Sequence, residues 1–213
     1  MINGFAPTAS RAESHPMEPR AWPLVQRWIT AAANAVDVLP ADPDAGRAAL
    51  EALGVTERSV LGALAVHTGG LAVDHGWLRV HGGPGLLDWR GRLEDGFVVG
   101  HDVVAGFFAV MEGDGEVRYL APDSLAWEGT EMSHSAWVHW TLTGDLEGYY
   151  ENLRWPGWEA EVAALPPDTG LALSPPPFTD EGRPVAHATR DPAPAAELWD
   201  AQQAYVRELT EGA

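Results

Sequence analysis

The apolar and polar residues of this chain alternate with two different periods. In the first third, apolar side chains follow each other at steps of three and four residues, the spacing of one helix face. Three helices are predicted there: 21–33, 42–53, and one that begins at Thr56 as N-cap and ends at Gly69-Gly70. After Gly70 the period changes to two, which is typical of half-buried strands.

Short apolar runs rich in β-branched residues alternate with glycine-rich turns in the middle of the chain. The predicted strands are 71–74, 77–81, 97–99, 103–111 and 117–121. The string Gly113-Asp114-Gly115 is a strong hairpin signal, so we expect antiparallel pairing. The string Gly-Gly-Pro-Gly at 82–85 predicts a loop.

The helical period returns at Ser133. Further helices are predicted to begin at Ser133, Asp145 and Pro156, and a closing helix spans 197–209. The stretch 166–194 is rich in Pro, Asp and Gly, which predicts mainly loop with a short edge strand near 184–189. Helices before and after an antiparallel sheet describe an α+β fold. We expect a flexible N-terminal segment over 1–20 and a single domain over 21–213.

The composition excludes several kinds of chemistry. The chain has no cysteine, which excludes disulfides, thiolate zinc sites and cysteine nucleophiles. All 13 basic residues are arginine, so a lysine Schiff base and a Walker lysine are also excluded. A formal net charge of −18 without a basic patch disfavours nucleic-acid binding. No metal or cofactor site is predicted. Without a long apolar run or a signal-peptide pattern, we expect a cytoplasmic protein with no membrane contact.

Tryptophan is unusually common, with ten in the chain and seven of them between Trp77 and Trp158. Most recur at helix or strand spacing and therefore mark core positions. Trp77, beside polar neighbours, and Trp155 and Trp158, in the string Trp-Pro-Gly-Trp, are the candidates for contact with a ligand or partner. Core packing at the start of a helix is the favoured alternative for the last two.

Nine strings along the chain resemble, in the same order, the sequences of one family. They are 21–25, 38–40, 67–70, 74–79, 101–104, 106–109, 119–128, 142–146 and 154–159. The family is an uncharacterised bacterial one, the domain of unknown function 2625, and the resemblance covers roughly 21–209. It implies membership of that family and no activity.

A fainter similarity links the chain to the SUKH superfamily, which includes Smi/Knr-type proteins and bacterial toxin-immunity proteins. It rests on the helix ending at Gly69-Gly70, the following strands, the hairpin through Asp114-Gly115 and the helix near Ser133. The chain departs from that pattern because no acidic residue follows Gly106 and the insertion over 81–95 is long. The similarity implies a shared α+β organisation, and fold alone does not determine function.

Two classes of function are compatible with these residues. The first is a non-enzymatic, acidic, immunity-type protein that binds a basic protein partner, since complementary charge favours such association. The alternative is a small hydrolase, with a histidine as base and an arginine as anion clamp at the strand ends. Its candidate residues are Asp74, His75, Arg79, His101 and Asp102. Their convergence in one pocket would favour the enzyme, and the oligomeric state stays open.

Overall fold

The structure is a computed structural model that describes residues 21–211, so the predicted flexible segment over 1–20 lies outside the described residues. The helices are α1 (Trp22–Thr30), α2 (Pro43–Leu53), α3 (Val60–His67), α4 (Gly83–Asp88), α5 (His134–Thr143), α6 (Leu146–Tyr149), α7 (Trp158–Ala163) and α8 (Ala195–Glu211), with a 3₁₀ turn at Val185–His187. The strands are β1 (Val36–Val38), β2 (Gly70–Val73), β3 (Leu78–His81), β4 (Gly96–Asp102), β5 (Phe107–Met111), β6 (Glu116–Leu120), β7 (Trp127–Ser133), β8 (Thr169–Ser174) and β9 (Thr189–Pro194).

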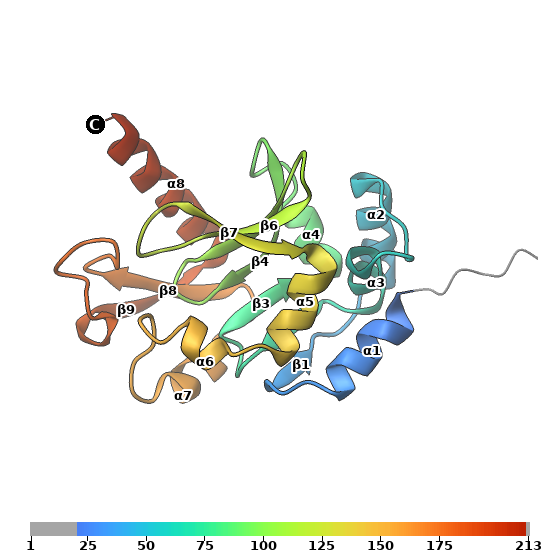
Figure 1. The fold of residues 1–213 in the computed structure, drawn as a ribbon, viewed down its shortest axis with the longest axis horizontal. Helices are drawn as coiled ribbons and strands as arrows, with labels where there is room; N and C mark the ends of the chain where they lie inside the picture. The colour runs from blue at the N-terminus through green and yellow to red at the C-terminus, as the bar shows by residue number, and fades with distance from the viewer. Residues whose placement is uncertain (1–20, 212–213) are drawn as a thin grey trace, which may run out of the picture.

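Strands β1 to β7 form one antiparallel sheet in which each strand pairs with the next along the chain. Strands β8 and β9 form a separate antiparallel ribbon. Figure 1 shows α1, α2 and α3 at one end of the sheet, and the β8–β9 ribbon with α8 at the other. The predicted α+β fold is confirmed. Among residues 21–211, no helix is both long and apolar enough to cross a membrane.

The two faces of the sheet carry different cores. Paired residues on antiparallel strands share a face, so Arg79, its partner His101 and the next partner Phe107 lie on one side. On that side Phe107 packs against Trp199 of α8, with ring centroids 5.0 Å apart. Neighbours along a strand point to opposite faces, and Phe108 packs against Trp137 of α5 on the other side.

Local hydrogen bonds explain where two predictions were wrong. The strand predicted over 103–111 begins only at Phe107, because the Asp102 carboxylate accepts the backbone N–H groups of Val104 and Gly106 and closes a turn. The third helix is capped by Ser59, whose hydroxyl accepts the N–H of Gly62, and not by Thr56. Such a capping oxygen satisfies one of the four unpaired N–H groups of a first helical turn.

At two other places, segments rich in glycine and proline were predicted as loops but form regular secondary structure. The predicted loop over 82–85 begins helix α4, because Pro84 has the backbone angle of a helix and needs no partner for a missing N–H. The predicted loop over 166–194 contains the β8–β9 ribbon, whose register runs from Thr169 opposite Pro194 to Ser174 opposite Thr189. An isolated ribbon tolerates prolines that a central strand would exclude.

Candidate functional site

A cavity of about 490 Å³ lies on the Phe107 side of the sheet, over β3 and β4. Arg79 and His81 of β3 and His101 of β4 contribute to its wall, together with Trp89, which follows α4. All four of these residues are buried. Other lining residues come from the first turn of α8 and from the segment before β8, so the cavity joins elements that are distant in the sequence.

Arg79 is a largely buried arginine with no carboxylate in direct contact among residues 21–211. It is 6% exposed, and its guanidinium makes no hydrogen bond or ion pair with any of the described residues. A Cβ atom on Gly76 would lie 2.4 Å from the Arg79 Nη1 atom, so the glycine leaves room for the head group. Burial lowers the pKa of the Arg79 guanidinium, and the charge of Asp37 partly opposes this effect. Removing a charge from water without pairing it costs several kcal/mol.

The two histidines of the wall bond to each other. His81 Nε2 lies 2.9 Å from His101 Nδ1, and the Trp89 ring stacks on His81 at 5.3 Å. Burial lowers the pKa of His81 to about 4. Burial, His81 and Arg79 together hold the pKa of His101 well below its usual range, so both rings are neutral near pH 7. Among residues 21–211, no group of three or more His, Asp and Glu side chains could hold a metal ion.

The N-terminus of α8 adds positive potential to the same cavity. Pro194, Ala195 and Ala196 line it, and the Ala195 N–H donates to the Asp168 carbonyl at 2.8 Å. No side chain of the described region caps the first turn of this 17-residue helix. Unpaired N–H groups and the helix dipole at such an end attract anions.

The mouth of the cavity carries charges of both signs. Asp88 and Asp168 are exposed there, as is Arg92, whose guanidinium lies 5.2 Å from the centre of the Trp89 ring. Arg92 also contacts Asp200 at 3.5 Å. These exposed charges are screened by water and salt more strongly than the buried groups of the wall.

Asp74 and His75 lie in a different place from Arg79. Asp74 pairs with Arg154, whose guanidinium stacks 4.9 Å from the Trp77 ring and 4.2 Å from the Trp158 ring. His75 meets the edge of Trp158 at 6.0 Å. A groove of about 590 Å³ passes over these residues, and its other lining side chains include Glu147, Glu151 and Glu159.

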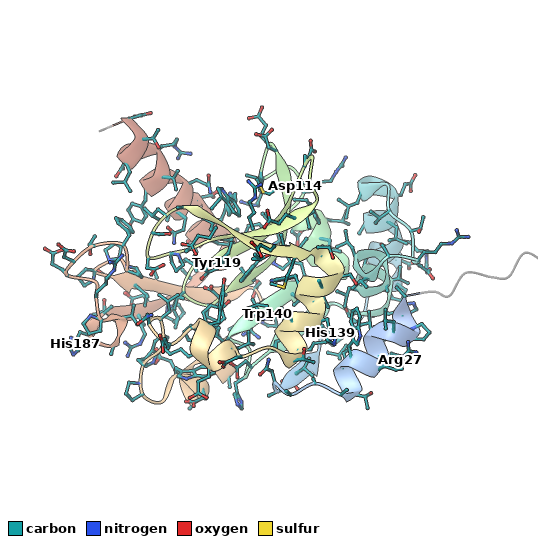
Figure 2. The ribbon with its side chains drawn as sticks, viewed as in Figure 1. Arg27, Asp114, Tyr119, His139, Trp140 and His187 are labelled. Carbon is teal, nitrogen blue, oxygen red and sulfur yellow. The ribbon has the colours of Figure 1, made fainter. Side chains whose placement is uncertain are left out.

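Asp102 is fully buried on the opposite face from His101. Besides the two turn N–H groups, it accepts the Tyr119 hydroxyl at 2.6 Å, and Tyr119 is labelled in Figure 2. Burial raises the pKa of Asp102 to about 6, although its three hydrogen bonds oppose the change. The five residues of the predicted hydrolase site therefore occupy three environments and do not converge. The reason is the alternation of side chains along β3 and β4, which separates His101 from Asp102.

The three candidate tryptophans also differ in burial. Trp77 is 0% exposed and Trp155 is 5% exposed, and Trp155 lines the groove over Arg154. The Trp155 N–H donates to Glu161 at 2.8 Å, and Arg190 stacks on its ring at 4.6 Å. Both side chains are packed in the core, and the binding roles expected for them stay predictions. Trp158 alone of the three is half-buried.

The sequence predicted Arg79 and His101 as site residues, but it did not predict the cavity that they line. Arg79 and His81 are two residues apart on a predicted strand, and this spacing could have placed them on one face. Trp89 and the start of α8 had no comparable signal, because their approach to β3 depends on packing between distant segments.

Comparisons with known proteins are consistent with the resemblance seen in the sequence. The family described as protein of unknown function DUF2625 matches residues 13–198. An uncharacterized Escherichia coli (strain K12) protein, YbfG, is 36% identical over 204 residues, covering 87% of this chain and 91% of the relative. An uncharacterized Haemophilus influenzae protein is 29% identical over 167 residues, covering 70% and 73% respectively. No solved structure gave a significant match.

The family assignment follows from the extent of these matches, while the fainter SUKH similarity stays a prediction. The matched segment contains the strands and residues that line the cavity, up to Ala196. Neither relative carries a described activity in its name. The chain belongs to the DUF2625 family of proteins of unknown function.

Proposed function

We propose that this protein binds a small anionic molecule in the cavity over β3 and β4. The observation that carries the proposal is Arg79, a residue of the cavity wall that is 6% exposed and has no hydrogen-bond or ion-pair partner among residues 21–211. A cation in this position is costly in the free protein unless an anion pairs with it. Arginine also binds carboxylate and phosphate groups with two parallel hydrogen bonds.

The surroundings of Arg79 support the same kind of ligand. The uncapped first turn of α8 lines the cavity with its positive end, and the two neutral imidazoles add polar groups without negative charge. A volume of about 490 Å³ lies within the range of small-molecule pockets, roughly 300–1,000 Å³. The acidic side chains Asp88 and Asp168 are exposed at the mouth, where they oppose anion binding only weakly.

Minimal anions test this proposal without knowledge of the natural ligand. The thermal unfolding midpoint would be measured in phosphate, sulfate and acetate, each against sodium chloride of the same ionic strength. We expect at least one of the three to raise the midpoint, by about 2–4 °C per kcal/mol of binding free energy. If none of them stabilises the protein more than chloride does, the proposal is wrong.

The Arg79→Met variant separates binding from folding. It removes the buried charge but keeps an unbranched side chain, so we expect the anion effect to disappear while stability in chloride stays equal or rises. Arg207→Met is the matched control, because Arg207 is exposed and lies roughly 18 Å further along α8 than Ala195. An anion effect retained in Arg79→Met would contradict the assignment of this residue.

Binding of a basic protein partner, and with it an immunity-type role, stays a prediction. The hydrolase hypothesis loses its five-residue site, because only Arg79 and His101 of the five line the cavity.

A further inference from the structure

A second concave surface lies away from the cavity over β3 and β4. It is the groove of about 590 Å³ beside Arg154, and it shares no described lining residue with that cavity. Its walls come from the turn between β2 and β3, from α6 and the segment after it, and from the start of α7, which Figure 1 shows next to α6. The groove is therefore a separate candidate for binding.

The rim of the groove is acidic, and most of its carboxylates are unpaired. Glu147, Glu151 and Glu159 line it and are exposed, and their side chains have no hydrogen bond or ion pair with any of residues 21–211. The fourth carboxylate, Asp74, is paired with Arg154, the one arginine among the described lining residues. Because that pair is neutral as a whole, the groove carries an uncompensated negative charge at positions that solvent reaches.

The groove also has an apolar surface that is already in place. Trp155, Pro156 and Trp158 contribute to it, and of these Pro156 is exposed and Trp158 is half-buried. The Trp158 ring packs against Trp77, with ring centroids 5.1 Å apart, and against the Arg154 guanidinium at 4.2 Å. These contacts fix the ring before anything binds, and such preorganisation lowers the entropy cost of association.

Lysine and arginine side chains match both parts of this groove. Each has an apolar stem and a positively charged head, so the stem can cover the proline and the indole while the head reaches a carboxylate. A single exposed ion pair contributes little, but three carboxylates around one hollow attract a segment with several cations and guide its approach. A second copy of this chain, with its net charge of −18, is disfavoured because like charges repel.

We propose that the groove beside Arg154 is the docking surface for a basic segment of another protein. Lysine or arginine heads of that segment pair with Glu147, Glu151 and Glu159, and their stems cover Pro156 and Trp158. The inference gives the basic partner predicted from the sequence a defined surface. It does not depend on anion binding in the cavity over β3 and β4, because the two places share no described lining residue.

A peptide of alternating arginine and glycine tests the proposal, with a glutamate–glycine peptide of the same length as its control. Isothermal titration calorimetry on the full chain, near physiological salt, measures binding. We expect a submillimolar dissociation constant for the arginine peptide and no binding of the control. If the arginine peptide does not bind at millimolar concentration, the proposal is wrong. Spermidine that binds more tightly than the peptide would also overturn it, in favour of a small polyamine.

Two charge-matched variants separate the groove from the overall negative charge of the chain. The first removes the three rim carboxylates, and the second removes three exposed carboxylates elsewhere. They are Glu147→Gln/Glu151→Gln/Glu159→Gln and Glu181→Gln/Glu208→Gln/Glu211→Gln. We expect the first to weaken binding of the arginine peptide about tenfold and the second about twofold or less. Equal weakening by both would overturn the proposal, because net charge alone would then attract the peptide.

The indole signals of the wild type give a readout that does not depend on the folding of any variant. In ¹H–¹⁵N spectra we expect the arginine peptide to shift the Trp158 indole signal, because this ring lines the groove. The Trp199 indole should keep its position, because that side chain is buried against Phe107 on the other side of the sheet. A Trp158 signal that does not respond at saturating peptide would overturn the proposal.

Discussion

His81 Nε2 lies 2.9 Å from His101 Nδ1 across β3 and β4, in a wall that Trp89 closes by stacking on His81. The bond needs one ring nitrogen without a proton, so it is incompatible with two charged rings. Burial also disfavours the charged form of each ring. The pair is therefore a polar group that the folded protein keeps neutral.

Acid should destabilise the protein through this pair. The folded-state pKa values are lowered from the usual 6.5, so the contribution to stability is complete above about pH 6.5 and is lost as the pH falls toward 4. We expect the wild type to lose at least about 1.4 kcal/mol more than His81→Gln/His101→Gln between pH 7 and pH 4.5, the equivalent of one pKa unit. Urea unfolding at both pH values measures the difference. Parallel losses in the two proteins would contradict it.

Asp102 should have the opposite pH dependence. Its pKa is raised from 3.8 to about 6, so its contribution is greatest below about pH 4 and is lost as the pH rises through 6. Relative to Asp102→Asn, the wild type should lose roughly 3 kcal/mol between pH 3.8 and pH 7. Unfolding free energies of both proteins over this range check the sign. A difference that stays constant with pH would mean that folding does not shift the pKa of Asp102.

Gly106 should not tolerate alanine. An added Cβ would lie 2.2 Å from Asp102 Oδ2 and 2.3 Å from the Tyr119 hydroxyl, so it would displace the hydrogen bond between them. We expect Gly106→Ala to lower the free energy of unfolding by about 1–3 kcal/mol. Gly85→Ala is the control, because its Cβ would meet only the His81 Cβ at 3.9 Å. Equal stability of the two variants would show that the Asp102 turn adapts.

The two tryptophans beside Arg154 should differ in their contribution to stability. Trp77 is fully buried, so Trp77→Ala should cost about 3–5 kcal/mol, while Trp158→Ala on the half-buried side chain should cost less. Urea unfolding gives both values, with Trp77→Phe as a milder variant if the alanine protein does not fold. A larger loss for Trp158→Ala would place the main core contact at Trp158 instead.

Much of the helical part of the fold could be predicted from local pattern. Gly54 ends α2 in the left-handed conformation, with φ of 64°, as its place after an amphipathic run indicated. The hairpin at Gly113-Asp114-Gly115 joins β5 and β6 as predicted. The β8–β9 ribbon was missed because proline at 192 and 194 hides strand propensity, and pairing between distant segments has no local signal.

The sequence by itself determined the α+β organisation, the absence of cysteine and lysine chemistry, and the family, because these depend on composition, short-range periodicity and characteristic strings. Only the tertiary structure decided which polar residues meet. Strand pairing placed Arg79 beside His101, the alternation of faces turned Asp102 away, and the packing of α8 brought Ala195 to the same cavity. These outcomes depend on register and on contacts between remote segments, which local sequence pattern does not encode.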